Sequence, residues 1–404
     1  MIRKGAIVAT LVTTTVVTCL RAARLPNSFA TEHWLIDYRF GFVKRGLVGS
    51  IVAVVAAALR TRPSEAAIQA LAVAAFVTFC TAMVWVCIRM LTDSRWSSDV
   101  ALAALVFLSS PFMVMSAHLV GYYDNIVVML GIVSLALVFA GRIGSAAIVQ
   151  ALSLLVHENT LLLTLPAVAW ATYVTTPPSA ALRRRMVPLL VPIVSFALLL
   201  LRQATAPHHL ERSLTHYLSS YPFVAVTLPD VRVPHWITIG FYDSYMLHHG
   251  HFQERVLSPA MIALVFPSLL GLLGVLFAGD TFVAVSPRTA VVLAMCLLPQ
   301  AMHLLVWDTA RTWTYSILCA FLLLWIDVET TPARVRSSQF VRFVLLAALL
   351  VNAIAVTPLM DGLRERFEVT TRLLMYAPVF LIGLSLARPS RRRASGEPGG
   401  SIVT

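Results

Sequence analysis

Long stretches without a charged side chain restrict the possible folds of this chain more than any other feature. Residues 261–278 and 314–326 contain no Asp, Glu, Lys or Arg, and only 12% of all residues are charged. A soluble domain carries about twice that share, placed mainly on the outer faces of its helices. A backbone in lipid must satisfy its own hydrogen bonds, and the alternation typical of strands is absent. We therefore predict an all-α, polytopic integral membrane protein.

Apolar segments recur from one end of the chain to the other. They cover residues 6–20, 47–59, 66–88, 100–118, 125–140, 144–175, 187–202, 259–278, 289–306, 313–327, 339–357 and 372–387. This pattern predicts about 12 transmembrane helices, within a range of 11–13. Segment 144–175 is too long for one upright helix and carries His157-Glu158-Asn159 at its middle. It is either one tilted helix or two short helices that meet at a polar break.

The helical bundle is expected to occupy residues 1–387. Residues 1–20 have the cations and apolar stretch of a secretory signal, but no clear small-residue cleavage site follows, so we interpret them as an uncleaved first helix. Residues 388–404 are rich in Arg, Ser, Gly and Pro. This composition predicts a disordered, basic cytoplasmic tail.

Cations near the segment ends predict which loops face the cytoplasm. They place the N-terminus, the arginines at 183–185, 334 and 336, and the tail inside. Twelve crossings then put residues 21–46, 203–258, 307–312 and 358–371 on the outer face, and residues 60–65 and 328–338 on the inner face. The same count puts Asp124 opposite Asp37. If segment 144–175 is two helices, the count becomes thirteen, and either the N-terminus or one early segment must reverse.

The net charge of +12 comes from cations scattered over many segment ends. This scatter is typical of the positive-inside bias, whereas a nucleic-acid-binding domain gathers its cations on one face, so we expect no nucleic-acid partner. The five cysteines lie within apolar segments and show no CxxC spacing. We predict neither a disulfide nor a metal site for them. They are Cys19, Cys80, Cys87, Cys296 and Cys319.

The densest polar cluster lies in the first loop, between residues 37 and 49. Asp37 is suited to act as a general base or to hold a divalent cation, which is the one cofactor the sequence suggests. Arg39, Lys44 and Arg45 are suited to bind a phosphate or pyrophosphate, and the glycines at 41, 46 and 49 permit a tight turn. The alternative is an interfacial segment that only anchors the chain.

Three further polar groups interrupt apolar sequence. Asp124 follows two tyrosines and is either a site residue or a helix cap. His157 and Glu158 are an ionisable pair within apolar sequence, which indicates function by default, the alternative being a polar plug between helices. Asp308 and Arg311 are three residues apart, a spacing suited to one helical face and an ion pair; the alternative is an interfacial anchor, because a tryptophan flanks each end.

The loop 203–258 is rich in histidine and aromatic residues. Asp243 and the histidines at 248, 249 and 251 are chemically capable of binding a metal ion, but their spacing fits no standard ligand set. We therefore interpret this loop as solvated and predict no metal site in it.

The chain resembles the GT-C superfamily of membrane glycosyltransferases that use polyprenyl-phosphate sugars. An acidic residue, Asp37, lies in the loop after the first apolar segment, and Asp124 follows Pro111 and His118 ahead of the next one. Residues 155–161, running on to Pro166, are similar to the short paired helices of that superfamily. The likeness covers about a third of the chain, and the C-terminal soluble domain of many members is missing.

The resemblance implies a GT-C-like bundle that transfers a sugar, with inversion, from a polyprenyl-phosphate donor to a glycan, lipid or protein acceptor at the outer face. Asp37 would be the general base, and Arg39, Arg45 or Arg311 would hold the departing lipid phosphate. Asp124, His157, Glu158 and Asp308 would line the sugar or acceptor pocket.

Two other functions fit the same residues. One is a polysaccharide polymerase or ligase that acts on lipid-linked oligosaccharide. The other is a transporter or flippase with the intramembrane His, Glu and Asp residues as its pathway. Many terminal arginines and the lack of Asn-x-Ser/Thr sites favour a bacterial inner (plasma) membrane.

Overall fold

The computed structural model describes residues 4–176, 185–205, 209–278, 286–331 and 339–388. Within these ranges the chain forms helices and turns and no strand, which confirms the all-α prediction. Six of the described helices are long and apolar enough to cross a membrane, as expected for a membrane protein. They are residues 65–93, 98–118, 187–204, 259–276, 309–330 and 369–387. The arginines at 183, 184, 334 and 336 and residues 389–404 lie outside the described residues.

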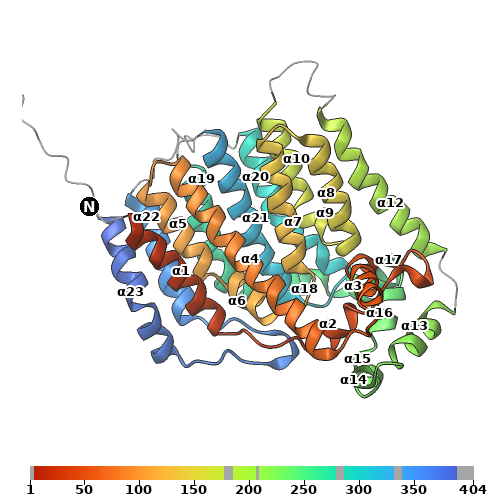
Figure 1. The fold of residues 1–404 in the computed structure, drawn as a ribbon. Coiled ribbons are helices and arrows are strands. Elements are labelled where there is room, and N and C mark those ends of the chain that lie inside the picture. Colours follow the sequence, from red (N-terminus) through yellow and green to blue (C-terminus); the bar gives the residue numbers. More distant parts are fainter. Residues whose placement is uncertain (1–3, 177–184, 206–208, 279–285, 332–338, 389–404) are drawn as a thin grey trace, which may run out of the picture.

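Fourteen of the described helices stand side by side in a bundle (Figure 1). They are α1 (Lys4–Leu20), α4 (Glu65–Asp93), α5 (Ser98–Ser109), α6 (Pro111–His118), α7 (Asp124–Phe139), α8 (Ile143–Val156), α9 (Thr160–Leu163), α10 (Leu165–Val174), α12 (Leu190–Ala204), α19 (Pro259–Leu276), α20 (Pro287–Leu297), α21 (Thr309–Thr330), α22 (Gln339–Ile354) and α23 (Val369–Ala387). Turns of 3₁₀-helix, η2 (Val187–Leu189) and η4 (Leu298–Leu304), precede α12 and follow α20.

Short helices gather at one end of the bundle, drawn at the bottom of Figure 1. They are α2 (Ser28–His33), η1 (Tyr38–Phe40), α3 (Gly46–Ala58), α13 (Leu210–Leu218), α14 (Pro222–Ala225), α15 (Leu228–Val231), α16 (Val233–Thr238), α17 (Phe241–His248), η3 (His249–His251), α18 (Phe252–Val256) and η6 (Met360–Gly362). We call this the loop end. Two contacts between distant segments hold it together: Trp34 Nε1 donates to the Gly121 oxygen over 2.7 Å, and Lys44 Nζ to the Ile239 oxygen over 2.9 Å.

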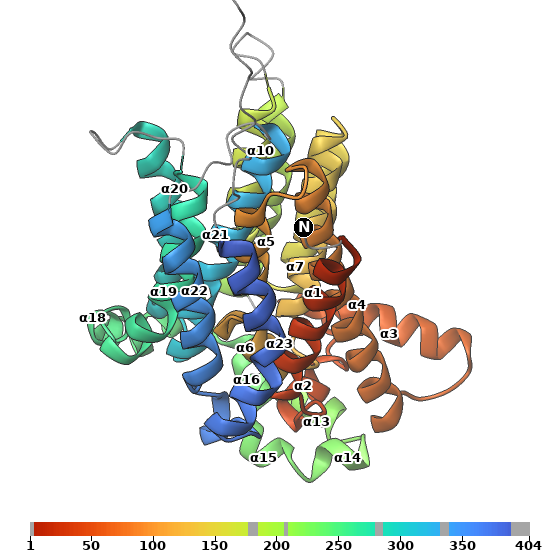
Figure 2. The ribbon, with the colours of Figure 1, turned by 90° about the vertical axis from the view of Figure 1, so that its left-hand side faces the viewer.

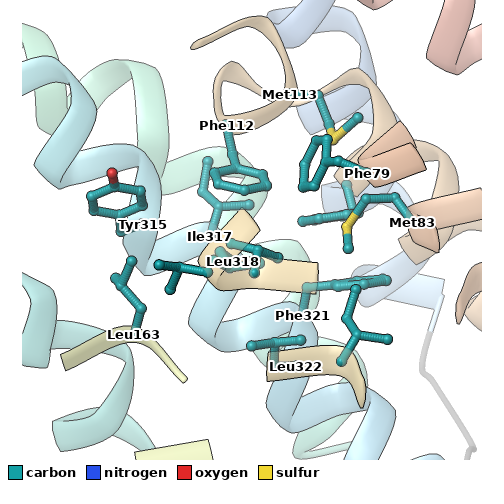
Figure 3. Packing of buried hydrophobic residues seen from close by; sticks show 14 of the residues in the cluster. Phe79, Met83, Phe112, Met113, Leu163, Tyr315, Ile317, Leu318, Phe321 and Leu322 are labelled. Carbon is teal, nitrogen blue, oxygen red and sulfur yellow. The ribbon is translucent and has the colours of Figure 1, made fainter. Parts of the chain in front are cut away.

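Helices α5 and α21 form the centre of the bundle. Residues 99–109 of α5 are buried, and so are the residues of α21 from Arg311 to Val328. Both helices are apolar on all sides, which is the composition that a helix surrounded by other helices requires. Their rings meet directly, since Phe107 and Phe321 stack with centroids 3.6 Å apart. Figure 3 shows Phe321 among the neighbouring core side chains, including Phe79 and Phe112.

Ion pairs mark the opposite end of the bundle. Arg89 contacts Glu329 over 2.8 Å, Arg342 contacts Asp99 over 2.6 Å, and Arg288 pairs with Asp327. Lys4 Nζ lies over the Trp96 ring, so α1 begins and α4 ends here. Since α1 runs to the loop end and α4 starts there, residues 21–64 leave from and return to the same end.

This path corrects the predicted topology at segment 47–59. The segment is helical, as α3, but it projects sideways from the bundle and does not cross it (Figure 2). Residues 60–65 therefore lie at the same end as residues 21–46, and the prediction that they face the opposite side is wrong. A helix of 13 residues is about 20 Å long, too short for a hydrocarbon layer of about 30 Å.

Segment 144–175 is two helical arms that meet at a polar break. Helix α8 ends at Val156, and the chain turns at residues 157–159 before α9 and α10. Asn159 Nδ2 donates to Asp124 Oδ1 over 3.1 Å, so the break lies next to the start of α7 at the loop end. Because α3 does not cross the bundle, Asp37 and Asp124 lie at the same end of it, and the predicted opposition between them is wrong.

Candidate functional site

A cavity of about 560 Å³ lies at the loop end. Its walls come from α2, the turn before α3, the α8–α9 break, α12, residues 236–248 and residues 302–311. Six of the nine site residues predicted from the sequence line it: Lys44, Arg45, His157, Glu158, Asp308 and Arg311. A seventh, Asp124, lies directly behind the wall. Segments more than 250 residues apart in the sequence therefore contribute charged side chains to one pocket.

The turn before α3 brings two cations into the cavity. Arg45 adopts a left-handed conformation with φ of 62°, which is uncommon for a residue other than glycine. Its Nε donates to Glu158 Oε2 over 3.1 Å, and its Nη2 pairs with Glu158 Oε1. The guanidinium thus binds the carboxylate with two nitrogens, the geometry that arginine forms best. Backbone strain at this position is sustained by the contacts around it.

Lys44 is the second cation of this turn. Its Nζ donates to the Ile239 oxygen and lies 5.6 Å from the centre of the Phe241 ring. Burial lowers the pKa of this amine to about 8, while the Glu158 carboxylate opposes that effect. Lys44 therefore remains mainly protonated at neutral pH, and its remaining N–H groups are suited to a second, negatively charged partner.

The α8–α9 break connects the cavity to the core. His157 ends α8 in an extended conformation, and its Nδ1 accepts from the Asn159 backbone N–H. Asn159 in turn binds Asp124, whose Oδ1 also accepts from Tyr315 Oη over 2.7 Å. Tyr315 and Asn159 were not predicted as site residues. Asn159 adjoins the predicted His-Glu pair, whereas nothing in the sequence near Tyr315 connects it with Asp124.

Asp308 and Arg311 stand where α21 begins. Asp308 Oδ1 accepts from the backbone N–H of Arg311 over 3.2 Å, so this carboxylate caps the helix. The side chain of Arg311 lies between two carboxylates, 3.6 Å from Asp308 and 3.9 Å from Asp124. The sequence prediction that Asp308 and Arg311 lie together on one helical turn is confirmed by these contacts.

Asp37 and Arg39 lie at the loop end but do not line the cavity. Asp37 begins η1 and accepts from the backbone N–H and the side chain of Arg39 at 2.7–3.0 Å. The Arg39 guanidinium covers the Tyr217 ring at 4.3 Å. The structure therefore separates these two residues from the other seven, and their expected roles stay predictions.

Histidines contribute to the cavity as neutral side chains. His33 lines it, and burial together with the neighbouring Arg45 lowers the pKa of His33 to about 3. Its Nδ1 lies 2.7 Å from the Phe29 oxygen, which leaves Nε2 to face Arg45. His248 is the one member of the predicted histidine group that lines the cavity. Within the described residues, no three His, Cys, Asp or Glu side chains gather as a metal site.

The close approach of α3 to residue 36 permits a test of the Lys44–Arg45 turn. A Cβ atom at Gly49 would lie 1.9 Å from the Ile36 backbone oxygen. We expect Gly49→Ala to shift this turn and to lower the free energy of unfolding by about 1–3 kcal/mol. Gly144→Ala is the matched control, because nothing lies within 4 Å of its Cβ position. The control should raise stability slightly. Equal unfolding midpoints for both variants would contradict the packing described.

Glu32 predicts how stability depends on pH. Its side chain is buried next to the cavity wall, Oε1 accepts from Thr227 Oγ1 over 3.0 Å, and Oε2 has no hydrogen-bond partner. Burial raises the pKa of this carboxyl from 4.5 to about 7. The folded protein thus keeps a proton that the unfolded chain loses, so stability should fall as the pH rises from 4.5 to about 7. In thermal unfolding, the Glu32→Gln variant should not show this fall in stability with pH. Parallel profiles of unfolding midpoint against pH for the two proteins would contradict the role of Glu32.

Comparisons of the chain with protein-family models, with curated proteins and with solved structures find no match. The residues that converge on the cavity are therefore the basis on which its function is inferred.

Proposed function

We propose that this protein is a membrane glycosyltransferase that moves a sugar from a polyprenyl-phosphate donor to a glycan, lipid or protein hydroxyl. The observation that carries the proposal is the cavity itself. Two carboxylates and three cations, from segments far apart in the sequence, line it at one end of an apolar bundle. Transfer from a sugar phosphate requires this combination, because an acid–base group and a phosphate-binding group must act on the same bond.

The helix arrangement supports the GT-C resemblance. With α3 lying sideways and α8 separate from α9–α10, we propose twelve membrane-spanning segments. Two of them, α5–α6 and α9–α10, are each made of two consecutive helices. Asp37 and Asp124 then share one end, as the two acidic positions do in that superfamily. Among the described residues, no acidic side chain lies midway along a long helix; they all lie near one end or the other. This distribution supports transfer over transport, which requires polar groups along a path through the membrane.

The apolar part of the cavity wall suits a lipid carrier. Phe196 of α12 lines the cavity, while most of the other side chains of this helix are exposed. Exposed apolar residues on α12 include Leu190, Ile193, Val194, Leu198 and Leu201. In a membrane these residues face lipid, because water would make their exposure costly. A prenyl chain in the lipid beside α12 would place its phosphate next to the polar wall.

The residues of the cavity suggest a direct displacement. The acceptor oxygen attacks the anomeric carbon as the bond from that carbon to the phosphate oxygen breaks, and the configuration inverts. Asp308, whose carboxylate lines the cavity, accepts the proton of the acceptor hydroxyl. The polyprenyl phosphate leaves with its negative charge stabilised by Arg311 and Lys44. Asp37 is the rival base, because it lies at the same end of the bundle.

The proposal is tested with the purified full-length protein in liposomes. The donor is a set of prenyl-phosphate sugars, each radiolabelled in the sugar, and the acceptors are extracts of membrane lipids and glycans. Transfer of label from at least one donor, with release of prenyl phosphate, would support the function. Label that crosses the liposome membrane while still attached to its donor would support the flippase alternative and overturn the transferase.

The orientation of the loop end is tested by labelling with a membrane-impermeant maleimide. Val226 is exposed at the loop end and Arg142 at the opposite end, while the native cysteines are buried or half-buried. In intact cells, Val226→Cys should react with the reagent, and Arg142→Cys should react only after permeabilisation. The reverse pattern would place the cavity on the cytoplasmic side.

A further inference from the structure

The three cations of the cavity differ in how many of their donors are already bound. All three side-chain nitrogens of Arg45 have a partner: Nε and Nη2 face Glu158, and Nη1 lies 3.4 Å from His33 Nε2. The Glu158 carboxylate already neutralises this guanidinium, so a new anion would have to compete with Glu158 for it. Arg45 is therefore poorly suited to meet a ligand, although it was predicted as a phosphate-binding residue.

Arg311 has the opposite arrangement. Its side chain is 10% exposed, and the nearest carboxylate oxygens lie 3.6 Å from Nε and 3.9 Å from Nη1. Both distances are longer than a hydrogen bond, and the buried Nε has no hydrogen-bond partner. Asp308 and Asp124 thus stabilise the positive charge without binding these N–H groups directly. A buried N–H without a partner destabilises the folded protein unless a ligand accepts a hydrogen bond from it.

The hydrogen bonds of Asp124 explain why its carboxylate stays 3.9 Å from Arg311. Asp124 Oδ1 accepts two hydrogen bonds, from Tyr315 Oη at 2.7 Å and from Asn159 Nδ2 at 3.1 Å. These bonds fix the carboxylate, and its other oxygen, Oδ2, forms no hydrogen bond and faces Arg311 from 3.9 Å. Without them, the carboxylate is expected to rotate towards Arg311 and form a direct pair, as Glu158 does with Arg45.

We propose that Arg311 is the receptor for the phosphate of the cavity's ligand, and that Tyr315 and Asn159 are positioning residues that hold Asp124 away from it. This inference rests on the proposed function for the source of the phosphate, a prenyl phosphate. The chemistry at Arg311 would be the same for a free phosphate, and the experiment therefore includes both. Tyr315 and Asn159 act only through Asp124 and do not touch the ligand.

The experiment measures binding of farnesyl phosphate and of inorganic phosphate to the purified full-length protein. Trp236 and Trp307 line the cavity, so tryptophan fluorescence reports on its occupation. We expect Arg311→Gln to weaken farnesyl phosphate binding at least tenfold. The double variant Arg89→Gln/Glu329→Gln removes an ion pair at the opposite end of the bundle without changing net charge, and it should bind within threefold of the original protein. Loss of affinity in this control with retention in Arg311→Gln would overturn the assignment.

Tyr315→Phe tests the positioning role and does not depend on whether Arg311→Gln folds. It removes one hydroxyl, and we expect at least fivefold weaker binding with an unchanged or higher unfolding midpoint. In an Asp124→Asn background the same change should alter binding less than twofold, because an amide does not form an ion pair with Arg311. An equal loss of affinity in both backgrounds, or a loss of affinity accompanied by a lower unfolding midpoint, would show that Tyr315 is purely structural. Either result would overturn its positioning role.

The outcomes separate this inference from the proposed function. Binding that depends on Arg311, in a protein that transfers no sugar, would support the receptor and refute the transferase. Sugar transfer with unchanged affinity in Arg311→Gln would refute the receptor alone. Binding of inorganic phosphate but not of farnesyl phosphate, again dependent on Arg311, would support the receptor and assign it to a free phosphate. No binding of either probe would overturn the receptor.

Discussion

Replacing Asp308 by asparagine is expected to reduce sugar transfer at least about 100-fold, the range that loss of a general base produces. Asparagine is as good a helix cap as aspartate, so α21 should still begin at the same residue. The variant thus removes the charge and the proton acceptor but keeps the cap. The measurement is the initial rate of label transfer in liposomes, together with the unfolding midpoint of the same preparation.

Asp37→Asn is the matched comparison for Asp308→Asn. Asp37 lies at the same end of the bundle, but its carboxylate is bound to Arg39 and does not line the cavity. We expect a much smaller loss of activity, through displacement of η1 and the loop that carries Lys44. If Asp37→Asn abolishes transfer while Asp308→Asn retains it, then Asp37 is the base, as the resemblance implies.

The largest effect on stability is expected at Glu365. Its side chain is 2% exposed and lies between two buried arginines, Arg21 and Arg372, at 2.8 and 2.9 Å. Glu365 also accepts from the Thr357 backbone N–H over 2.6 Å, which ties down the chain between α22 and α23. Glu365→Gln leaves two buried guanidinium groups without a counter-charge. We expect a loss of about 3–5 kcal/mol in the free energy of unfolding.

Glu329→Gln is the control for Glu365→Gln. Glu329 pairs with Arg89 over 2.8 Å at the opposite end of the bundle, and the Arg89 side chain is 49% exposed. An exposed pair contributes little, so this variant should lose no more than about 1 kcal/mol. Denaturation of both variants in mixed micelles gives the comparison. Losses of equal size would mean that burial does not decide the strength of these pairs.

The sequence predicted the class of fold and the charged residues that line the cavity, because both depend on local signals. Apolar segments without charge indicate helices in lipid, and a polar break such as His157-Glu158 is evident within such a segment. The prediction that segment 47–59 crosses the bundle was wrong, although its shortness was a usable signal. That single error placed Asp124 on the side opposite Asp37.

The remaining parts of the site were not predictable from local patterns. Tyr315 and Asp124 are 191 residues apart, and only the packing of α21 against the start of α7 brings them together. For Asp37 the local pattern leaves two interpretations open. The density of charge around it indicated a site, but Arg39, two residues further on, binds its carboxylate. Clustered opposite charges in a sequence often bind one another, and spacing alone does not distinguish this from a shared pocket.

The two walls of the cavity differ in mechanical support. Arg311 belongs to α21, whose sides are enclosed by other helices, whereas Lys44 and Arg45 precede α3, which exposes Ile51, Val54, Val55 and Leu59. Displacing the first wall would disturb the whole interior. Moving the second wall outward breaks the contacts of Lys44 with Ile239 and of Arg45 with Glu158, while the outer face of α3 only exchanges one set of acyl chains for another. Admission of a bulky substrate should therefore proceed by movement of the α3 side, and its rate should vary with the viscosity of the surrounding bilayer.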